Sequence, residues 1–201
     1  MRVAVLASGR GSNFQSILDA SERGDLPNCK IKLLIVNRIE AYAIERAKKH
    51  NIPYYIIESK NKKRQNFDQE MLEILKSNQI EIVVLAGFMR ILSKQFISEY
   101  KDKIINIHPS LLPKFPGAHA HRDAIEAKAK ISGCTVHFVD EGVDTGPIIM
   151  QESVAVDRDD DEHTLSEKIL PIEHKIYPKV LDLLTSNKLK IINGKVITET
   201  D

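Results

Sequence analysis

Residues 2–18, RVAVLASGRGSNFQSIL, place a short apolar run, a glycine-rich loop and the start of an amphipathic pattern in immediate succession. The run over 2–8 is continuous and includes β-branched side chains, as in a strand that is buried on both faces of a parallel sheet. From Phe14 to Leu18 the apolar residues recur at helical spacing. This stretch therefore predicts a strand, the loop GRGSN at 9–13 and a helix.

The same alternation continues through the first half of the chain. Strands that alternate with helices form βαβ units, whose right-handed crossovers place helices on both faces of a mainly parallel sheet. We therefore predict an α/β, Rossmann-like fold. Strands are predicted at 31–37, 53–57, 80–86 and 103–108, and further helices around 43–50, over 66–78 and around 93–100.

The pattern changes after His108. Residues 109–117, PSLLPKFPG, contain three prolines and a glycine and are predicted to be irregular. A helix is predicted near 119–129. The strands predicted at 132–139 and 147–156 have no helix between them, which indicates an antiparallel pair in the C-terminal part of the chain.

The last part of the chain contains the longest predicted helix, over 162–186. Pro171 and Pro178 lie inside it and predict a kink or a break. An Asn-Gly pair between two apolar runs then predicts a hairpin over 189–198.

Length and composition exclude several classes of protein. The 201 residues suit one domain, predicted over 1–188 with residues 189–201 as a hairpin extension of it. A net charge of +1 lacks the basic excess of nucleic-acid binders. Cys29 and Cys134 are too far apart for a Cys-x-x-Cys motif, which fits a reducing cytosol. No apolar stretch approaches the roughly 18 to 20 residues of a membrane span. We predict a cytoplasmic protein with no nucleic-acid or membrane partner.

The loop GRGSN lies where a helix presents unpaired N–H groups and the positive end of its dipole. Gly9 and Gly11 permit a tight turn and the close approach of an anion. Ser12 and Asn13 can cap the helix or donate hydrogen bonds to phosphate oxygens. A capped turn without a ligand is the structural alternative.

The loop differs from the fingerprint of dinucleotide-binding proteins. Phe14 stands where that fingerprint has its third glycine. The second predicted strand ends in Asn37 and Arg38 rather than in an acidic residue. The sequence therefore favours a small phosphate ester over a dinucleotide.

Asn106 and His108 end the strand predicted at 103–108. A period of two puts both side chains on one side of the strand, at the carboxyl edge where α/β sheets bind ligands. An amide and an imidazole can both donate to one oxyanion, and an imidazole can carry a proton near neutral pH. Asp144 can raise the pKa of His108 or hold a water molecule. The alternative is a structural histidine and a turn-forming aspartate.

A metal site is the main chemical alternative. The candidate ligands are four histidines and one carboxylate. His119 and His121 lack the four-residue spacing of H-E-x-x-H, so we predict no metal. The candidates are His108, His119, His121, His137 and Asp144.

Separated segments of the chain resemble the folate-dependent formyltransferases, and four of them agree in order and spacing. They are VLASGRGSN (5–13), LAGFMRILS (85–93), INIHPSLLPKFPG (105–117), DEGVDTGPI (140–148) and IEHKIYP (172–178). The resemblance implies formyl transfer from the cosubstrate 10-formyltetrahydrofolate to the glycyl amine of glycinamide ribonucleotide, in purine biosynthesis. The amine would attack directly and form a tetrahedral intermediate.

The resemblance also implies residue roles. Asn106 and His108 would stabilise the intermediate, His108 would protonate the leaving folate nitrogen, and Asp144 would keep His108 protonated. The ribonucleotide would be bound by Gly11, Ser12, Asn13, Leu170, Pro171, Ile172 and Glu173. The folate would be bound by Arg64, Met89, Arg90, Ile91, Leu92 and Asn106, and by a loop of Asp140, Glu141, Gly142, Val143 and Asp144. The alternative for Arg64 is a solvated basic cluster, KNKKR at 60–64.

Other activities on the same core remain alternatives. A methionyl-tRNA formyltransferase would add an RNA-binding domain, and a formyltetrahydrofolate deformylase would add an N-terminal regulatory domain. Two residues depart from the family pattern, because Ala118 and Ala120 stand where bulkier residues are common.

A non-enzymatic folate or nucleotide sensor is disfavoured by the intact set of Asn106, His108 and Asp144. We expect a monomer or weak homodimer that acts on small molecules.

Overall fold

A computed structural model describes residues 1–60 and 62–199. A seven-stranded sheet has the order β3-β2-β1-β4-β5-β6-β7, and a separate two-stranded sheet consists of β8 and β9. The chain divides into two compact units, residues 1–105 and 106–201, and the division falls inside β5 (Ile104–His108). Among the described residues, no helix combines the length and apolar character needed to cross a membrane.

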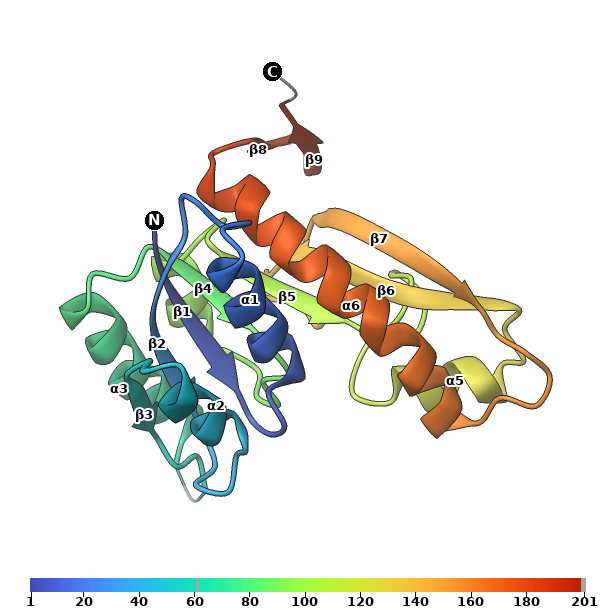
Figure 1. The fold of residues 1–201 in the computed structure, drawn as a ribbon, viewed down its shortest axis with the longest axis horizontal. Helices are drawn as coiled ribbons and strands as arrows, with labels where there is room; N and C mark the ends of the chain where they lie inside the picture. The colour runs from blue at the N-terminus through green and yellow to red at the C-terminus, as the bar shows by residue number, and fades with distance from the viewer. Residues whose placement is uncertain (61, 200–201) are drawn as a thin grey trace. The chain divides into compact units, whose positions relative to one another are not determined.

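The first unit has the predicted alternation of strands and helices (Figure 1). β1 pairs in parallel with β2 and β4, and β2 pairs in parallel with β3. Right-handed crossovers in this order place α1 and α2 on one face and α3 and α4 on the other, and each pair is in contact. The elements are β1 (Arg2–Ala7), α1 (Ser12–Glu22), β2 (Lys30–Val36), α2 (Ala43–Lys49), β3 (Tyr54–Ile56), α3 (Arg64–Ser77), β4 (Ile82–Leu85) and α4 (Lys94–Glu99).

The second unit contains the predicted antiparallel pair. After the irregular segment that follows β5, β6 and β7 pair antiparallel, and α6 packs on both strands and contacts α5 (Figure 1). In the β8–β9 hairpin Asn193 and Gly194 both have positive φ, as a tight two-residue turn requires. Residues 200 and 201 of the predicted extension lie outside the described residues. The elements are α5 (Ala120–Glu126), β6 (Ile131–Phe138), β7 (Ile148–Ala155), α6 (Glu162–Thr185), β8 (Leu189–Ile192) and β9 (Lys195–Thr198).

Of the kink or break predicted in the long helix, the break is wrong, because α6 runs unbroken through both Pro171 and Pro178. A proline inside a helix removes one backbone hydrogen bond and costs about 3 kcal/mol or more. Here the buried face of α6 offsets that cost by burying large apolar side chains on both sides of the prolines. These side chains are Leu165, Ile169, Ile176, Tyr177, Val180 and Leu181.

Candidate active site

Asn106 and His108 lie in the last three residues of β5, as predicted. His108 is only 4% exposed, whereas Asn106 is half-buried. The His108 Nε2–H donates a hydrogen bond to the carbonyl of Phe115 (2.8 Å), because a carbonyl can only accept. The irregular segment 109–117 therefore closes back on the end of β5.

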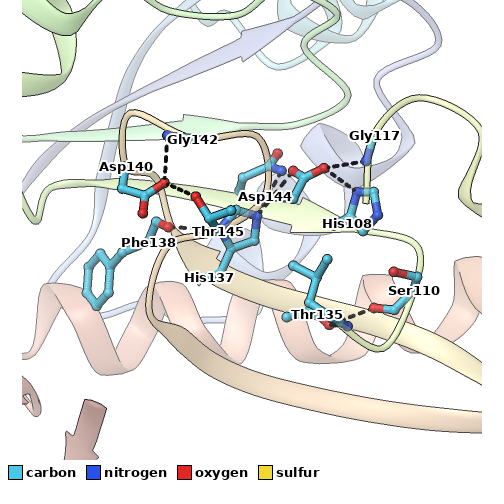
Figure 2. A network of polar contacts seen from close by, with 12 residues as sticks. His108, Ser110, Gly117, Thr135, His137, Phe138, Asp140, Gly142, Asp144 and Thr145 are labelled. Carbon is cyan, nitrogen blue, oxygen red and sulfur yellow. Dashed lines mark hydrogen bonds and ion pairs between the residues drawn. The ribbon is translucent and has the colours of Figure 1, made fainter. Parts of the chain in front are cut away.

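Asp144 takes part in a network of polar contacts in the second unit (Figure 2). Its Oδ2 lies 3.4 Å from His108 Nδ1 and accepts a hydrogen bond from the backbone N–H of Gly117 (2.8 Å). Its Oδ1 lies 3.6 Å from His137 Nε2. Asp144 has a φ of 55°, a left-handed conformation that aspartate tolerates better than most residues. The structure thus brings His108 and Asp144 together from distant segments.

His137 on β6 completes this group, although its sequence context marks it only as a candidate metal ligand. Its Nδ1–H donates to the Phe138 carbonyl (2.8 Å), so in the neutral ring Nε2 accepts from the Asn106 amide (3.2 Å). His137 is therefore the link between Asn106 and Asp144. Two polar residues spaced two apart in the apolar run SGCTVHF, Thr135 and His137, were the signal for this face of β6.

Thr135, two residues before His137 on β6, holds the irregular segment 109–117 in place (Figure 2). Its hydroxyl donates to the Ser110 carbonyl (2.6 Å) and accepts from the backbone N–H of Leu112 (3.0 Å). The amide of Gln151 on β7 donates to the same hydroxyl oxygen (2.8 Å). These bonds hold the segment that carries Phe115 and Gly117 against the β6–β7 pair.

For both His108 and Asp144, burial shifts the pKa in one direction and most of the neighbouring polar groups shift it in the other. Burial lowers the pKa of His108 below its ordinary value of 6.5, against the Phe115 carbonyl and the Asp144 carboxylate, which both favour the imidazolium. Burial alone would raise the pKa of Asp144, but the side-chain contact with His137, the hydrogen bond from the Gly117 N–H and the nearby His108 together hold it below its usual range. The pair at neutral pH is therefore a neutral imidazole beside a carboxylate.

This arrangement predicts a distinct titration of His108. The Asp144→Asn variant loses a carboxylate that favours the imidazolium, so the already lowered pKa of His108 should fall further. Histidine NMR titrations of native protein and variant would measure this shift. Asp140→Asn is the matched control, because Asp140 Oδ1 accepts hydrogen bonds from the Gly142 N–H and the Thr145 hydroxyl. An unchanged or raised His108 pKa in Asp144→Asn would contradict the prediction.

In the first unit, Gly11 forms the N-cap of α1 with a φ of 67°. A Cβ at this position would lie 2.7 Å from Ala43 Cβ, so the close approach of loop and α2 requires glycine. The prediction that Ser12 or Asn13 caps the helix is wrong, because both residues belong to α1 itself. The first turn of α1 contains no acidic residue, which leaves its positive end suited to an anion.

The segment predicted to line a pterin pocket follows β4. Met89 and Ile91 are 66% and 52% exposed, whereas Leu92 is 5% exposed and belongs to the core. The Arg90 guanidinium lies 5.0 Å from the Phe67 ring centroid. Arg64, at the first position of α3, is exposed.

Asp68 on α3 holds the end of this segment. Its buried carboxylate accepts a hydrogen bond from the backbone N–H of Ser93 (2.5 Å), and the residue is 2% exposed. The Asp68→Ala variant should lose about 1–3 kcal/mol of the free energy of unfolding, because the half-buried N–H of Ser93 loses its acceptor. Urea unfolding would measure the loss. Asp25→Ala is the control, since the exposed Asp25–Arg23 pair should contribute within about 0.5 kcal/mol. Equal stability of the two variants would contradict the prediction.

The remaining predicted residues lie in the second unit. Glu173 on α6 is 7% exposed, and burial, aided by Glu173 and Glu152, raises the pKa of Cys134 to about 12. Leu170 and Ile172 are half-buried and Pro171 is exposed. In the loop that follows β6, Glu141, Gly142 and Val143 are exposed, and Asp140 holds its turn through Gly142 and Thr145.

Within residues 1–60 and 62–199, no group of three or more histidine, cysteine, aspartate or glutamate side chains is arranged to hold a metal ion.

Comparison with known proteins gives consistent results. The family model described as formyl transferase matches residues 1–181. A phosphoribosylglycinamide formyltransferase of Bacillus subtilis is 41% identical over 184 residues, which are 91% of this chain and 94% of that protein. A crystal structure of glycinamide ribonucleotide transformylase 1 from Symbiobacterium toebii is 39% identical, with a TM-score of 0.97 over 100% of this chain and 94% of that one.

Longer proteins match as well. The human trifunctional purine biosynthetic protein adenosine-3 is 45% identical over 197 residues, which are 97% of this chain and 19% of that protein. The chain spans 14–20% of the length of the trifunctional proteins that it matches.

Proposed function

The chain belongs to the formyl transferase family, and we propose that it transfers a formyl group from 10-formyltetrahydrofolate to the glycyl amine of glycinamide ribonucleotide in purine biosynthesis. One observation of the structure carries the proposal: Asn106 and His108 lie at the end of β5 and both connect to Asp144, directly or through His137. This cluster joins hydrogen-bond donors to a proton carrier, which acyl transfer to an amine requires.

In the proposed reaction the amine nitrogen bonds to the formyl carbon, and the bond from that carbon to the folate nitrogen breaks. Negative charge builds on the formyl oxygen in the tetrahedral intermediate between these two steps. An amide NH2 has two N–H bonds, and His137 accepts only one from Asn106. The second N–H of Asn106 is the donor that we assign to the oxyanion.

His108 has two tasks in this scheme. Its Nε2–H donates to Phe115 in the free protein, and we propose that the oxyanion replaces that carbonyl as the acceptor. The new negative charge and Asp144 both favour the imidazolium. His108 then takes up the proton that the amine loses and passes it to the departing folate nitrogen, so the protons balance.

We assign residues of each unit to the binding of the two substrates. In the first unit Gly11, Ser12 and Asn13 bind the phosphate, while Arg64 and residues 89–92 contact the folate. In the second unit Glu173 and its helical neighbours Leu170, Pro171 and Ile172 contact the ribose or the glycinamide group. The loop 140–144 covers the pterin together with Asn106. The support for these assignments is the positive end of α1, the buried carboxylate of Glu173 and the exposed faces of Met89 and Ile91.

A single assay tests the proposal. Native protein is mixed with 10-formyltetrahydrofolate and glycinamide ribonucleotide, and folate absorbance and released formate are followed together. The expected result is turnover that requires the ribonucleotide and releases no formate. Formate released without the ribonucleotide would indicate a deformylase instead. Absence of any turnover that depends on the ribonucleotide would overturn the proposed function.

We also propose that the protein acts in the cytoplasm as a monomer or weak homodimer. Its net charge of +1 gives no large surface field for a polyanionic partner. Light scattering at several concentrations would show a mass between one and two chains, and a stable larger assembly would contradict this.

A further inference from the structure

Three successive carbonyls of the glycine loop have fixed hydrogen-bond partners. The Gly9 carbonyl accepts from the backbone N–H of Ala43 at the start of α2 (3.1 Å). The Arg10 carbonyl accepts from Nε of Arg46, one turn further along α2 (2.9 Å). The Gly11 carbonyl accepts from Gln15 within α1 (2.9 Å). Arg46 is the one side chain in this set, and it binds the middle carbonyl.

The direction of these carbonyls decides where the N–H groups of the loop point. In a trans peptide the C=O and the N–H of the same unit point in opposite directions. Holding the Arg10 carbonyl toward Arg46 therefore directs the N–H of Gly11 away from α2. Successive N–H groups that are oriented in this way form an anion-binding concavity.

The Arg46 guanidinium is itself held on several sides. Its Nη1 donates to Gln15 Oε1 (2.9 Å), and the Tyr42 ring centroid lies 5.1 Å from its Cζ. Gln15 is fixed in turn by Asp19 (2.7 Å) and by His50 (2.9 Å). These contacts use two donors of the guanidinium in a fixed geometry, which lysine cannot reproduce.

We propose that Arg46 is a positioning residue for the phosphate-binding loop, which acts through the Arg10 carbonyl rather than as a ligand of the phosphate. This inference rests on the proposed function, since that function assigns the phosphate to Gly11, Ser12 and Asn13. The same close approach of α2 to the loop leaves no room for a Cβ at Gly11.

The test separates positioning from simple charge. Arg46→Met keeps the apolar stem, and Arg46→Lys keeps the charge but not the two donors. Both variants should weaken the binding of ribose 5-phosphate, measured by calorimetry, on the order of tenfold. Both should raise KM for the ribonucleotide by a similar factor, while kcat and KM for the folate stay within about twofold. Lys48→Met is the control, because Lys48 lies on the same helix and pairs with Glu45.

Gln15→Met is a second variant that removes the acceptor of Nη1 without touching Arg46, and it should change binding in the same direction by less. Native-like binding by Arg46→Lys together with weak binding by Arg46→Met would overturn positioning in favour of charge. Native-like binding by both variants, or no binding of ribose 5-phosphate by native protein, would also overturn the inference. Native protein that binds ribose 5-phosphate with the expected dependence on Arg46 but transfers no formyl group would leave the inference standing and overturn the proposed function.

Discussion

His108→Ala and Asn106→Ala should each slow formyl transfer about 100- to 1000-fold, since one preorganised donor to an oxyanion contributes about 3–4 kcal/mol. The formyl oxygen carries its negative charge only in the tetrahedral intermediate and the flanking transition states, not in the bound substrates. The loss should therefore lower kcat more than it raises KM. His108→Ala also removes the proton carrier, which makes it the more damaging of the two changes.

Steady-state kinetics with both substrates would measure these effects. His163→Ala is the matched control, because the His163 side chain is 79% exposed on α6 and lies 3.7 Å from the exposed Glu167. Urea unfolding would establish that the slow variants are folded. Transfer by His108→Ala at the native rate would refute the assigned chemistry, whatever the family of the chain.

Gly11→Ala should raise KM for the ribonucleotide at least about tenfold and also destabilise the fold. A left-handed φ costs a residue with a Cβ about 1–2 kcal/mol. The new methyl would in addition lie 2.7 Å from Ala43 Cβ and 3.0 Å from Ala43 Cα. Relieving such a contact typically costs a further 1–3 kcal/mol or so, and here it displaces the loop whose N–H groups are assigned to the phosphate.

Gly24→Ala separates the two causes. Gly24 also has a positive φ, of 83°, but a Cβ there meets no atom within 4 Å. Its variant should show the cost of the backbone conformation alone and a native KM. If Gly11→Ala changed KM for the folate and not for the ribonucleotide, the assignment of the phosphate to this loop would be refuted.

The strands and helices could be predicted from short windows of sequence, because the strand period and the helix period are properties of neighbouring residues. The buried runs of β1 and β4, the helical spacing in α1 and α3 and the Asn-Gly turn of the last hairpin are all visible in short windows of sequence. The predicted break in α6 failed for the opposite reason. A proline is a local signal, but the apolar burial that offsets it depends on the packing of α6 on β6 and β7, which a short window of sequence does not show.

The candidate site divides in the same way. Asn106 and His108 could be predicted as a pair because two residues along one strand share a side. His137 could not be assigned a role, since its meeting with Asn106 depends on where β6 lies relative to the end of β5. The sequence predicted that Asp144 would raise the pKa of His108 and keep it protonated, but burial, which only the packed structure decides, lowers that pKa.

The sequence by itself therefore determined the order of strands and helices, the glycine loop at a helix start and the residue types able to transfer a formyl group. The tertiary structure alone decided that Asp144 contacts two imidazoles, that His137 joins Asn106 to it, and that Arg46 holds the carbonyl behind Gly11. The physical reason is the range of the forces. Backbone periodicity acts over a few residues, whereas hydrogen bonds between side chains 30 or more positions apart exist only after the chain has folded, as for Asn106 with His137, which are 31 apart.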